Sequence, residues 1–206
     1  GNDFASYWGL EKDDYKGAVD WIINRRLRKI DVGRVSYDAG DLRKTRYFIN
    51  AMYVGLGARF VWISNGTRRF WGMQWLSYLS SMFLLLFERK LHRIDMKING
   101  EHIQDTIMTV CIGSARGYGL TPSAVPYNGW LDVSVVYRPE LLQLIKGLWL
   151  LVNGRLLNLK VVKPYRTHKV KILRAQNAAI SLDGRQLYND ESSLDVRILP
   201  EALTLI

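Results

Sequence analysis

The first five residues of the chain, GNDFA, place an amide and a carboxylate where the pattern predicts the start of a helix. Asn2 and Asp3 would lie there beside free main-chain amides, a combination that can hold phosphate or a cation bound to phosphate. An aspartate at this position is also a common helix cap with no further role. The pentapeptide is therefore compatible with phosphate binding and with a purely structural cap.

A late Asp-Gly pair offers a second kind of chemistry, which is proton transfer. Residues 181–187 read SLDGRQL, and Asp183–Gly184 between two β-rich runs predicts a two-residue hairpin turn. If this turn lies at the edge of a cleft, the Asp183 carboxylate could accept a proton from a hydroxyl group. Formation of the turn is by itself the simpler reason for the pair.

A loop over residues 113–133 lies between these two motifs and is rich in Gly and Pro around Arg116. Glycines allow a main chain to approach a ligand closely, although the same composition also suits two ordinary turns. The loop contains Asn128–Gly129, a turn signal that leads into a predicted strand.

Helices account for a small part of the predicted secondary structure. Apolar spacing predicts helices over residues 13–26 and 71–87, and Pro139 begins a third over residues 139–152. The apolar stripe of the first predicted helix consists of Ala18, Val19, Ile22 and Ile23.

Strands make up most of the remaining chain. They are predicted where β-rich or alternating runs are bounded by Gly, Asn-Gly or Asp-Gly. These runs cover residues 29–35, 46–55, 93–100, 101–113, 130–137, 168–173, 178–184 and 193–199. Many strands joined by short turns, with few helices, predict an antiparallel α+β fold.

The composition is that of a basic globular protein. The 206 residues contain 29 Lys and Arg against 19 Asp and Glu, so the formal net charge is +10, and 48% are hydrophobic. This apolar content disfavours intrinsic disorder. Cys111 is the single cysteine, which excludes an internal disulfide and a cysteine-rich zinc site. Residues 70–87 lack charge but contain several polar residues, so we expect a helix packed in the protein instead of a membrane span, with contact to lipid as an alternative.

Four motifs in a fixed order resemble one family, the diacylglycerol kinase catalytic-domain superfamily of bacterial lipid kinases related to the sphingosine and diacylglycerol kinases. The motifs are GNDFA at residues 1–5, RYFINAMYVGLGA at residues 46–58, the loop at residues 113–133, and LDG at residues 182–184 followed by VRILPEAL at residues 196–203.

The resemblance begins partway through the family's pattern. These kinases start with an α/β nucleotide-binding domain that carries a GGDG loop, and no such loop occurs in this sequence. Residues 1–28 are therefore expected to be the remnant of the nucleotide-binding domain. Residues 29–206 are expected to form the C-terminal domain, an antiparallel β-sandwich-like lipid kinase domain with a few helices. We expect such a fragment to be inactive by itself.

The resemblance also implies roles for individual residues. Asp3 matches the family's aspartate near the nucleotide phosphates and magnesium, with Asn2 beside it. Asp183 matches an acidic residue proposed to help deprotonate the lipid hydroxyl, but Arg185 stands where the family has a glutamate. The family's turn that binds a structural magnesium reads Asn128–Gly129 here; an asparagine brings no charge, so we expect weaker binding of a divalent cation.

The implied function is ATP-dependent phosphorylation of a lipid alcohol, with ATP and Mg²⁺ as cofactors. We expect a cytoplasmic protein that binds no nucleic acid and attaches peripherally to an anionic membrane. The sequence is compatible with an oligomer and leaves the oligomeric state open. The expected attachment site is the helix at residues 71–87 with its flanks, Arg68, Arg69, Arg89 and Lys90. An NAD kinase-like enzyme is one alternative. A basic β-rich module without enzymatic activity, binding nucleic acid or anionic membrane, is the other.

Overall fold

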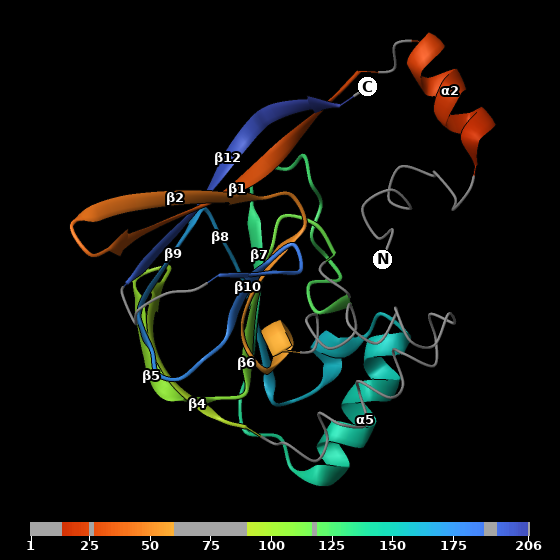
Figure 1. Cartoon of the computed structure of the whole chain (residues 1–206). Coiled ribbons are helices and arrows are strands. Elements are labelled where there is room, and N and C mark those ends of the chain that lie inside the picture. The colour runs from red at the N-terminus through yellow and green to blue at the C-terminus, as the bar shows by residue number, and fades with distance from the viewer. Residues whose placement is uncertain (1–13, 25–26, 60–89, 117–118, 188–192, 206) are drawn as a thin grey trace, which may run out of the picture.

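Two antiparallel sheets of six strands each build the part of the chain that the structure describes (Figure 1). The computed structural model describes residues 14–24, 27–59, 90–116, 119–187 and 193–205. Asn2, Asp3 and the predicted helix at residues 71–87 lie outside these ranges. The antiparallel sandwich with few helices confirms the α+β prediction.

The first sheet has the strand order β2-β1-β12-β9-β4-β5, and the second has the order β11-β10-β3-β6-β7-β8. The strands of the first sheet are β2 (Leu42–Phe48), β1 (Arg28–Ala39), β12 (Leu194–Leu205), β9 (Lys169–Ala175), β4 (His92–Ile98) and β5 (Glu101–Ile107). Those of the second sheet are β11 (Arg185–Leu187), β10 (Ile180–Leu182), β3 (Ala51–Gly55), β6 (Thr109–Gly113), β7 (Leu131–Val136) and β8 (Val162–Thr167).

The main hydrophobic core lies between the two sheets. Alternate residues of each strand point inward, as the period of two along a strand requires. Met96 and Val196 of the first sheet belong to the same buried cluster as Val54, Ile112 and Val133 of the second. These inward residues hold the two sheets face to face.

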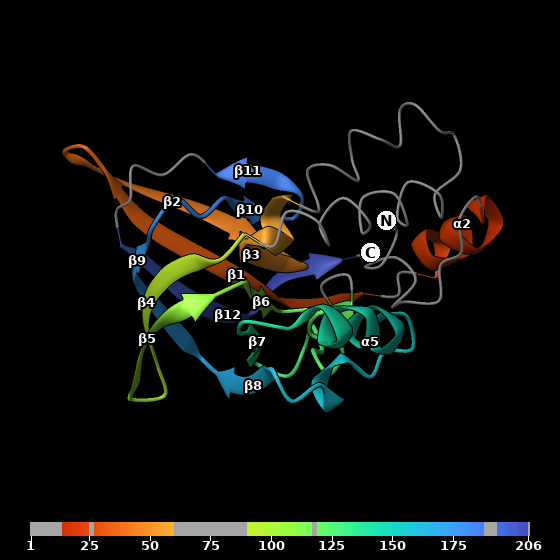
Figure 2. The ribbon, with the colours of Figure 1, turned by 90° about the horizontal axis from the view of Figure 1, so that it is seen from below.

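Helix α5 (Leu141–Val152) and the short 3₁₀ helix η2 (Leu156–Asn158) lie against the second sheet (Figure 2). Leu150 and Leu156 form a buried cluster there with Val136 and Val162. Helix α2 (Tyr15–Ile23) forms as predicted, and Asp14 caps it by accepting a hydrogen bond from the Gly17 amide. No described residue of α2 is buried, so its apolar stripe is exposed.

Two runs that the sequence presents as continuous strands are divided in the structure. Residues 46–55 separate into the end of β2 and the whole of β3, because Ile49 and Asn50 cross from the first sheet to the second. Residues 101–113 separate at Met108, whose amide donates to the Val136 carbonyl in the second sheet. Each division is a crossover between sheets, and the first one lies at the candidate site.

Candidate active site

Asp183 lies in the turn between β10 and β11. Leu182 pairs with Arg185, so Asp183 and Gly184 form a two-residue hairpin loop. Both have positive φ, at 46° and 83°, which is the conformation required by the turn type that Asp-Gly sequences favour. The predicted hairpin turn is confirmed.

The Asp183 carboxylate contacts the crossover between β2 and β3. One oxygen accepts a hydrogen bond from the Ile49 amide at 2.8 Å. The other accepts from the amides of Asn50 at 2.9 Å and Ala51 at 3.0 Å. The Asp183 amide in turn donates to the Ala51 carbonyl at 3.0 Å. Asp183 therefore fixes the position of three consecutive main-chain amides, in addition to forming its own turn.

Ser114 holds the same crossover from another side. Its hydroxyl donates to the Ile49 carbonyl at 2.9 Å, and the amides of Ser114 and Ala115 both donate to the Asn50 carbonyl at 3.0 Å. Ser114 is fully buried. The crossover residues, the loop that starts at residue 113 and the Asp-Gly turn thus meet at one place, and these are three of the four motifs that carry the family resemblance.

The electrostatic environment of Asp183 contains two opposing effects. Burial of its carboxyl group raises the pKa of Asp183, and the three amide hydrogen bonds from Ile49, Ala51 and Asn50 oppose that rise. The residue as a whole still has an exposed surface. A carboxylate with a raised pKa that remains in contact with solvent is suited to accept a proton from an approaching hydroxyl group.

Asn128 occupies a different position and serves the loop in which it lies. Its side-chain oxygen accepts a hydrogen bond from the Trp130 amide at 2.9 Å, and Gly129 has a φ of 74°. The nearby carboxylate is Asp31, which is 1% exposed and accepts from the amides of Gly129 at 2.6 Å and Glu201 at 2.9 Å.

These hydrogen bonds bear on the magnesium that was expected at Asn128. The Asn128 amide oxygen and both Asp31 carboxylate oxygens already accept main-chain amides. Within the described part of the chain, no group of three His, Cys, Asp or Glu side chains could hold a metal ion. The magnesium expected at Asn128 stays a prediction, and no chemical step is assigned to it.

Two residues of this end of the sandwich were not identified from the sequence. Asp31 lies in a predicted strand, and the sequence pattern does not distinguish it from other polar strand residues. Its burial, which only the structure reveals, is the unusual feature. Asp132 is 9% exposed and binds Arg166 through both oxygens, at 2.9 Å and 3.3 Å. Asp132 pairs with Gly113, which pairs with Ala51, so it lies in the same row of the second sheet as the Asp183 turn.

No helix in the part of the chain that the structure describes has the length and apolar character needed to cross a bilayer. Arg185, which stands in the place of the family's glutamate, has an exposed side chain two residues after Asp183. Asn2 and Asp3 are not among the described residues, so their distance from Asp183 is not given by the structure.

Residues 50–206 match a family described as the YegS C-terminal NAD kinase beta sandwich-like domain. A diacylglycerol kinase of Bacillus subtilis (strain 168) is 24% identical over 187 residues, which are 89% of this chain and 59% of that protein. The chain thus spans less than two thirds of the length of this relative.

Solved structures show the same fold at low sequence identity. A diacylglycerol kinase from Bacillus anthracis strain Sterne superposes with a TM-score of 0.61 at 13% identity, covering 98% of this chain and 62% of that one. A yeast NADH kinase in complex with NADH superposes with a TM-score of 0.51 at 11% identity, covering 93% of this chain and 47% of that one.

Proposed function

Since the chain belongs to the family of YegS C-terminal NAD kinase beta sandwich-like domains, we propose that the whole protein is an ATP-dependent lipid kinase that phosphorylates diacylglycerol or a related lipid alcohol. The family resemblance stated from the sequence is thereby confirmed at the level of the domain. The 24% identity to the diacylglycerol kinase of B. subtilis supports this choice of substrate class. The kinase activity of the whole protein, its lipid substrate and its use of ATP and Mg²⁺ are what we propose.

The observation that carries the proposal is the position of the Asp183 carboxylate. It lies where three family motifs meet and is oriented by the amides of Ile49, Asn50 and Ala51. A side chain held in this way loses little further freedom when a substrate binds, which favours a role in catalysis. The raised pKa of Asp183, caused by burial, increases its affinity for a proton.

In the proposed reaction Asp183 accepts the proton of the lipid hydroxyl group. The hydroxyl oxygen forms a bond to the γ-phosphorus of ATP, the bond from that phosphorus to the bridging oxygen breaks, and ADP leaves. Mg²⁺ bound to the phosphates would neutralise the charge that develops during the transfer. We propose that Asn2 and Asp3 contact these phosphates. The crossover amides keep the Asp183 carboxylate oriented during the proton transfer.

The alternative is an NAD kinase-like enzyme, and the superposition on the yeast NADH kinase is the observation in its favour. That likeness extends to the fold alone, at 11% identity. The two functions differ in the molecule that accepts the phosphoryl group, so an assay can separate them directly.

The test uses the full-length protein with ATP and either diacylglycerol in detergent micelles or NAD. We expect phosphate transfer to the lipid and none to NAD. Asp183→Asn should slow the transfer by roughly two to four orders of magnitude, because the proton acceptor is removed. Asp41→Asn is the matched control, since Asp41 also lies in a two-residue hairpin loop, between β1 and β2. Transfer to NAD alone, or wild-type turnover in Asp183→Asn, would contradict the proposal.

The 206-residue chain should be assayed beside the whole protein. We expect no phosphate transfer from the chain alone, because its sequence contains no GGDG nucleotide loop. Turnover by the purified chain at the rate of the whole protein would overturn this expectation and leave the lipid kinase activity itself in place.

A further inference from the structure

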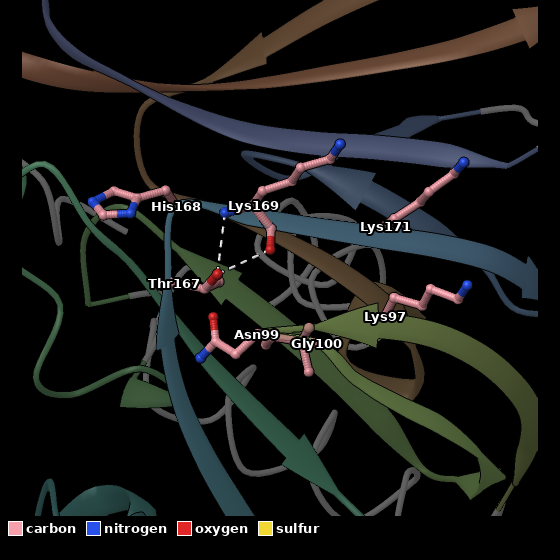
Figure 3. A pocket seen from close by; sticks show the side chains of 8 residues that line it. Lys97, Asn99, Gly100, Thr167, His168, Lys169 and Lys171 are labelled. Carbon is pink, nitrogen blue, oxygen red and sulfur yellow. Dashed lines mark hydrogen bonds between the residues drawn. The ribbon is translucent and has the colours of Figure 1, made fainter.

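Five basic side chains lie in adjoining positions on the outward face of the first sheet. They alternate with core residues along their strands: Lys169 and Lys171 are exposed on β9, and Val170 between them is buried. Figure 3 shows the side chains of Lys97, Lys169 and Lys171 extending in the same general direction from neighbouring strands. We call the following set the basic face: Arg34, Lys97, Lys169, Lys171 and Arg197.

The strand register places like charges directly opposite one another on this face. Lys97 of β4 pairs with Lys171 of β9. Arg197 of β12 pairs with Lys169 of β9 on one side and with Arg34 of β1 on the other. Directly opposite like charges destabilise an antiparallel pair of strands. The basic face therefore carries an electrostatic cost that binding of an anion would relieve.

Acidic side chains compensate only part of this charge. Asp195 binds Arg197 at 2.7 Å and Lys169 at 3.1 Å. In the register of β12 and β9 it also lies opposite Lys171, so one carboxylate lies beside three cations. Lys97 and Lys171 have no ion-pair partner among the residues that the structure describes. At the Lys97–Lys171 pair two neighbouring cations thus both lack an ion pair among the described residues.

An open hollow adjoins this pair, and its volume is large enough for a phosphate group. It has a volume of about 390 Å³ and is lined by Lys97, Ile98, Asn99, Gly100, Thr167, His168, Lys169 and Lys171. The Thr167 hydroxyl donates a hydrogen bond to the Lys169 carbonyl and accepts one from the Lys169 amide, as Figure 3 shows. The wall of the hollow is formed by the β4–β5 turn on one side and by the start of β9 on the other.

The basic face extends to the strand that leads into the candidate active site. From Lys169 the register runs through Arg197 and Arg34 to Tyr47 on β2. Tyr47 lies two residues before Ile49, whose amide binds Asp183. Three strand spacings correspond to about 14 Å. A flat partner bound to this face would thus lie beside the end of the sandwich that carries Asp183.

We propose that the basic face docks on an anionic phospholipid bilayer, with lipid phosphates seated against Lys97 and Lys171. The choice of a bilayer rests on the proposed function, because a lipid kinase must reach a substrate held at the membrane interface. A row of cations across four adjacent strands fits many lipid phosphates in a plane. A nucleic acid is the other anionic partner that such a face could bind, and the test below separates it from a bilayer.

The test measures binding of the whole protein to phosphatidylcholine vesicles with and without phosphatidylglycerol, in the absence of ATP. We expect binding only with the anionic lipid, weakened by added salt. The variant Lys97→Gln/Lys171→Gln should bind the anionic vesicles roughly tenfold to thirtyfold more weakly. It should unfold at an unchanged or higher temperature, since a like-charge pair is removed. Lys146→Gln/Lys160→Gln is the matched control, with the same change in net charge at two exposed lysines outside the basic face.

Each other outcome would overturn the proposal. Equal weakening by the two double variants would show a general effect of net charge. Equal binding to neutral and anionic vesicles would remove the electrostatic basis. Loss of oligonucleotide retention in Lys97→Gln/Lys171→Gln, with vesicle binding intact, would favour a nucleic acid as the partner. Because no ATP is present, failure of the kinase proposal would appear in the turnover assay and not in this one.

Discussion

The main-chain amide of Ile49 donates a hydrogen bond of 2.8 Å to the carboxylate of Asp183, which lies 134 residues later in the chain. The contact joins the crossover between the two sheets to the turn of a hairpin that belongs to the second sheet alone. A residue that appears to serve a local turn thus also fixes the path of a distant segment.

This contact changes the expected stability of Asp183→Asn. Asparagine suits the same hairpin turn, so the turn by itself predicts little effect. The asparagine amide, however, has one oxygen where the carboxylate has two, and its NH₂ group would face the Ile49 amide. We expect the free energy of unfolding to fall by about 1–3 kcal/mol. Urea unfolding of the chain measures this, and Asp41→Asn should leave the midpoint almost unchanged. A free energy of unfolding equal to that of the wild type would show that the three hydrogen bonds from main-chain amides contribute little to stability.

Gly33→Ala on β1 should disturb β2, the strand that precedes the crossover, through the ring of Phe48. A Cβ atom at Gly33 would lie 2.1 Å from the Phe48 ring, and Phe48 is its register partner on β2. Because the ring must move, we expect a loss of about 1–3 kcal/mol. The double variant Gly33→Ala/Phe48→Leu should recover part of this loss, which a double-mutant cycle detects as a coupling energy. Strict additivity of the two single variants would contradict the direct clash.

His92 makes the stability of the chain depend on pH. Burial lowers the pKa of His92 from 6.5, and the charges of Lys90 and Arg59 lower it further. Its Nε2 atom is buried with no hydrogen-bond partner among the described residues. Below about pH 6.5 the unfolded chain therefore binds a proton more readily than the folded chain does, and the free energy of unfolding decreases as the pH falls.

Urea unfolding at a series of pH values between about 7 and about 5 measures this slope. His92→Gln should reduce it, because the side chain no longer ionises. His102→Gln keeps the buried His92 and should retain the slope. If the free energy of unfolding of His92→Gln changed with pH as it does in the wild type, the pH dependence would come from other groups.

Cys111 is expected to be chemically inert in the folded protein. It is fully buried, and burial raises the pKa of its thiol to about 12. Since the thiolate is the reactive form, alkylation by iodoacetamide should be very slow in buffer and fast in concentrated urea. Mass spectrometry of the labelled chain gives both rates. Rapid labelling of the folded chain would show that the second sheet opens around β6.

The sequence predicted the elements better than the places where they change sheets. The Asp183–Gly184 turn and the helix that became α5 follow from short-range signals and are present. The crossovers at Ile49 and Met108 have no such signal, because apolar residues continue on both sides of each one. Strand β8 was not predicted: it contains Pro164 and several polar residues, and its place at the edge of the second sheet explains why a proline is tolerated.

The candidate site was predictable to a similar degree. Asp183 was identified by its residue type and turn, but its contacts with Ile49, Asn50 and Ala51 join segments that are far apart in the sequence. Asp31 was not identified, because only the fold reveals that this strand residue is buried. The Asn128 side-chain oxygen accepts the Trp130 amide within its own loop, and the metal role expected for Asn128 stays a prediction.

The pairing of β1 with β12 affects how the chain can fold while it is being synthesised. These strands are paired from Arg28 with Leu205 to Tyr37 with Leu194, so β1 remains without this neighbour until the residues of β12 have left the ribosome. The β1–β2 hairpin can form early, but its free edge is a template for pairing with other chains until then. Contacts of such long sequence separation also slow folding. Slower translation or binding of a chaperone to nascent β1 would therefore change the yield of folded protein more than its final stability.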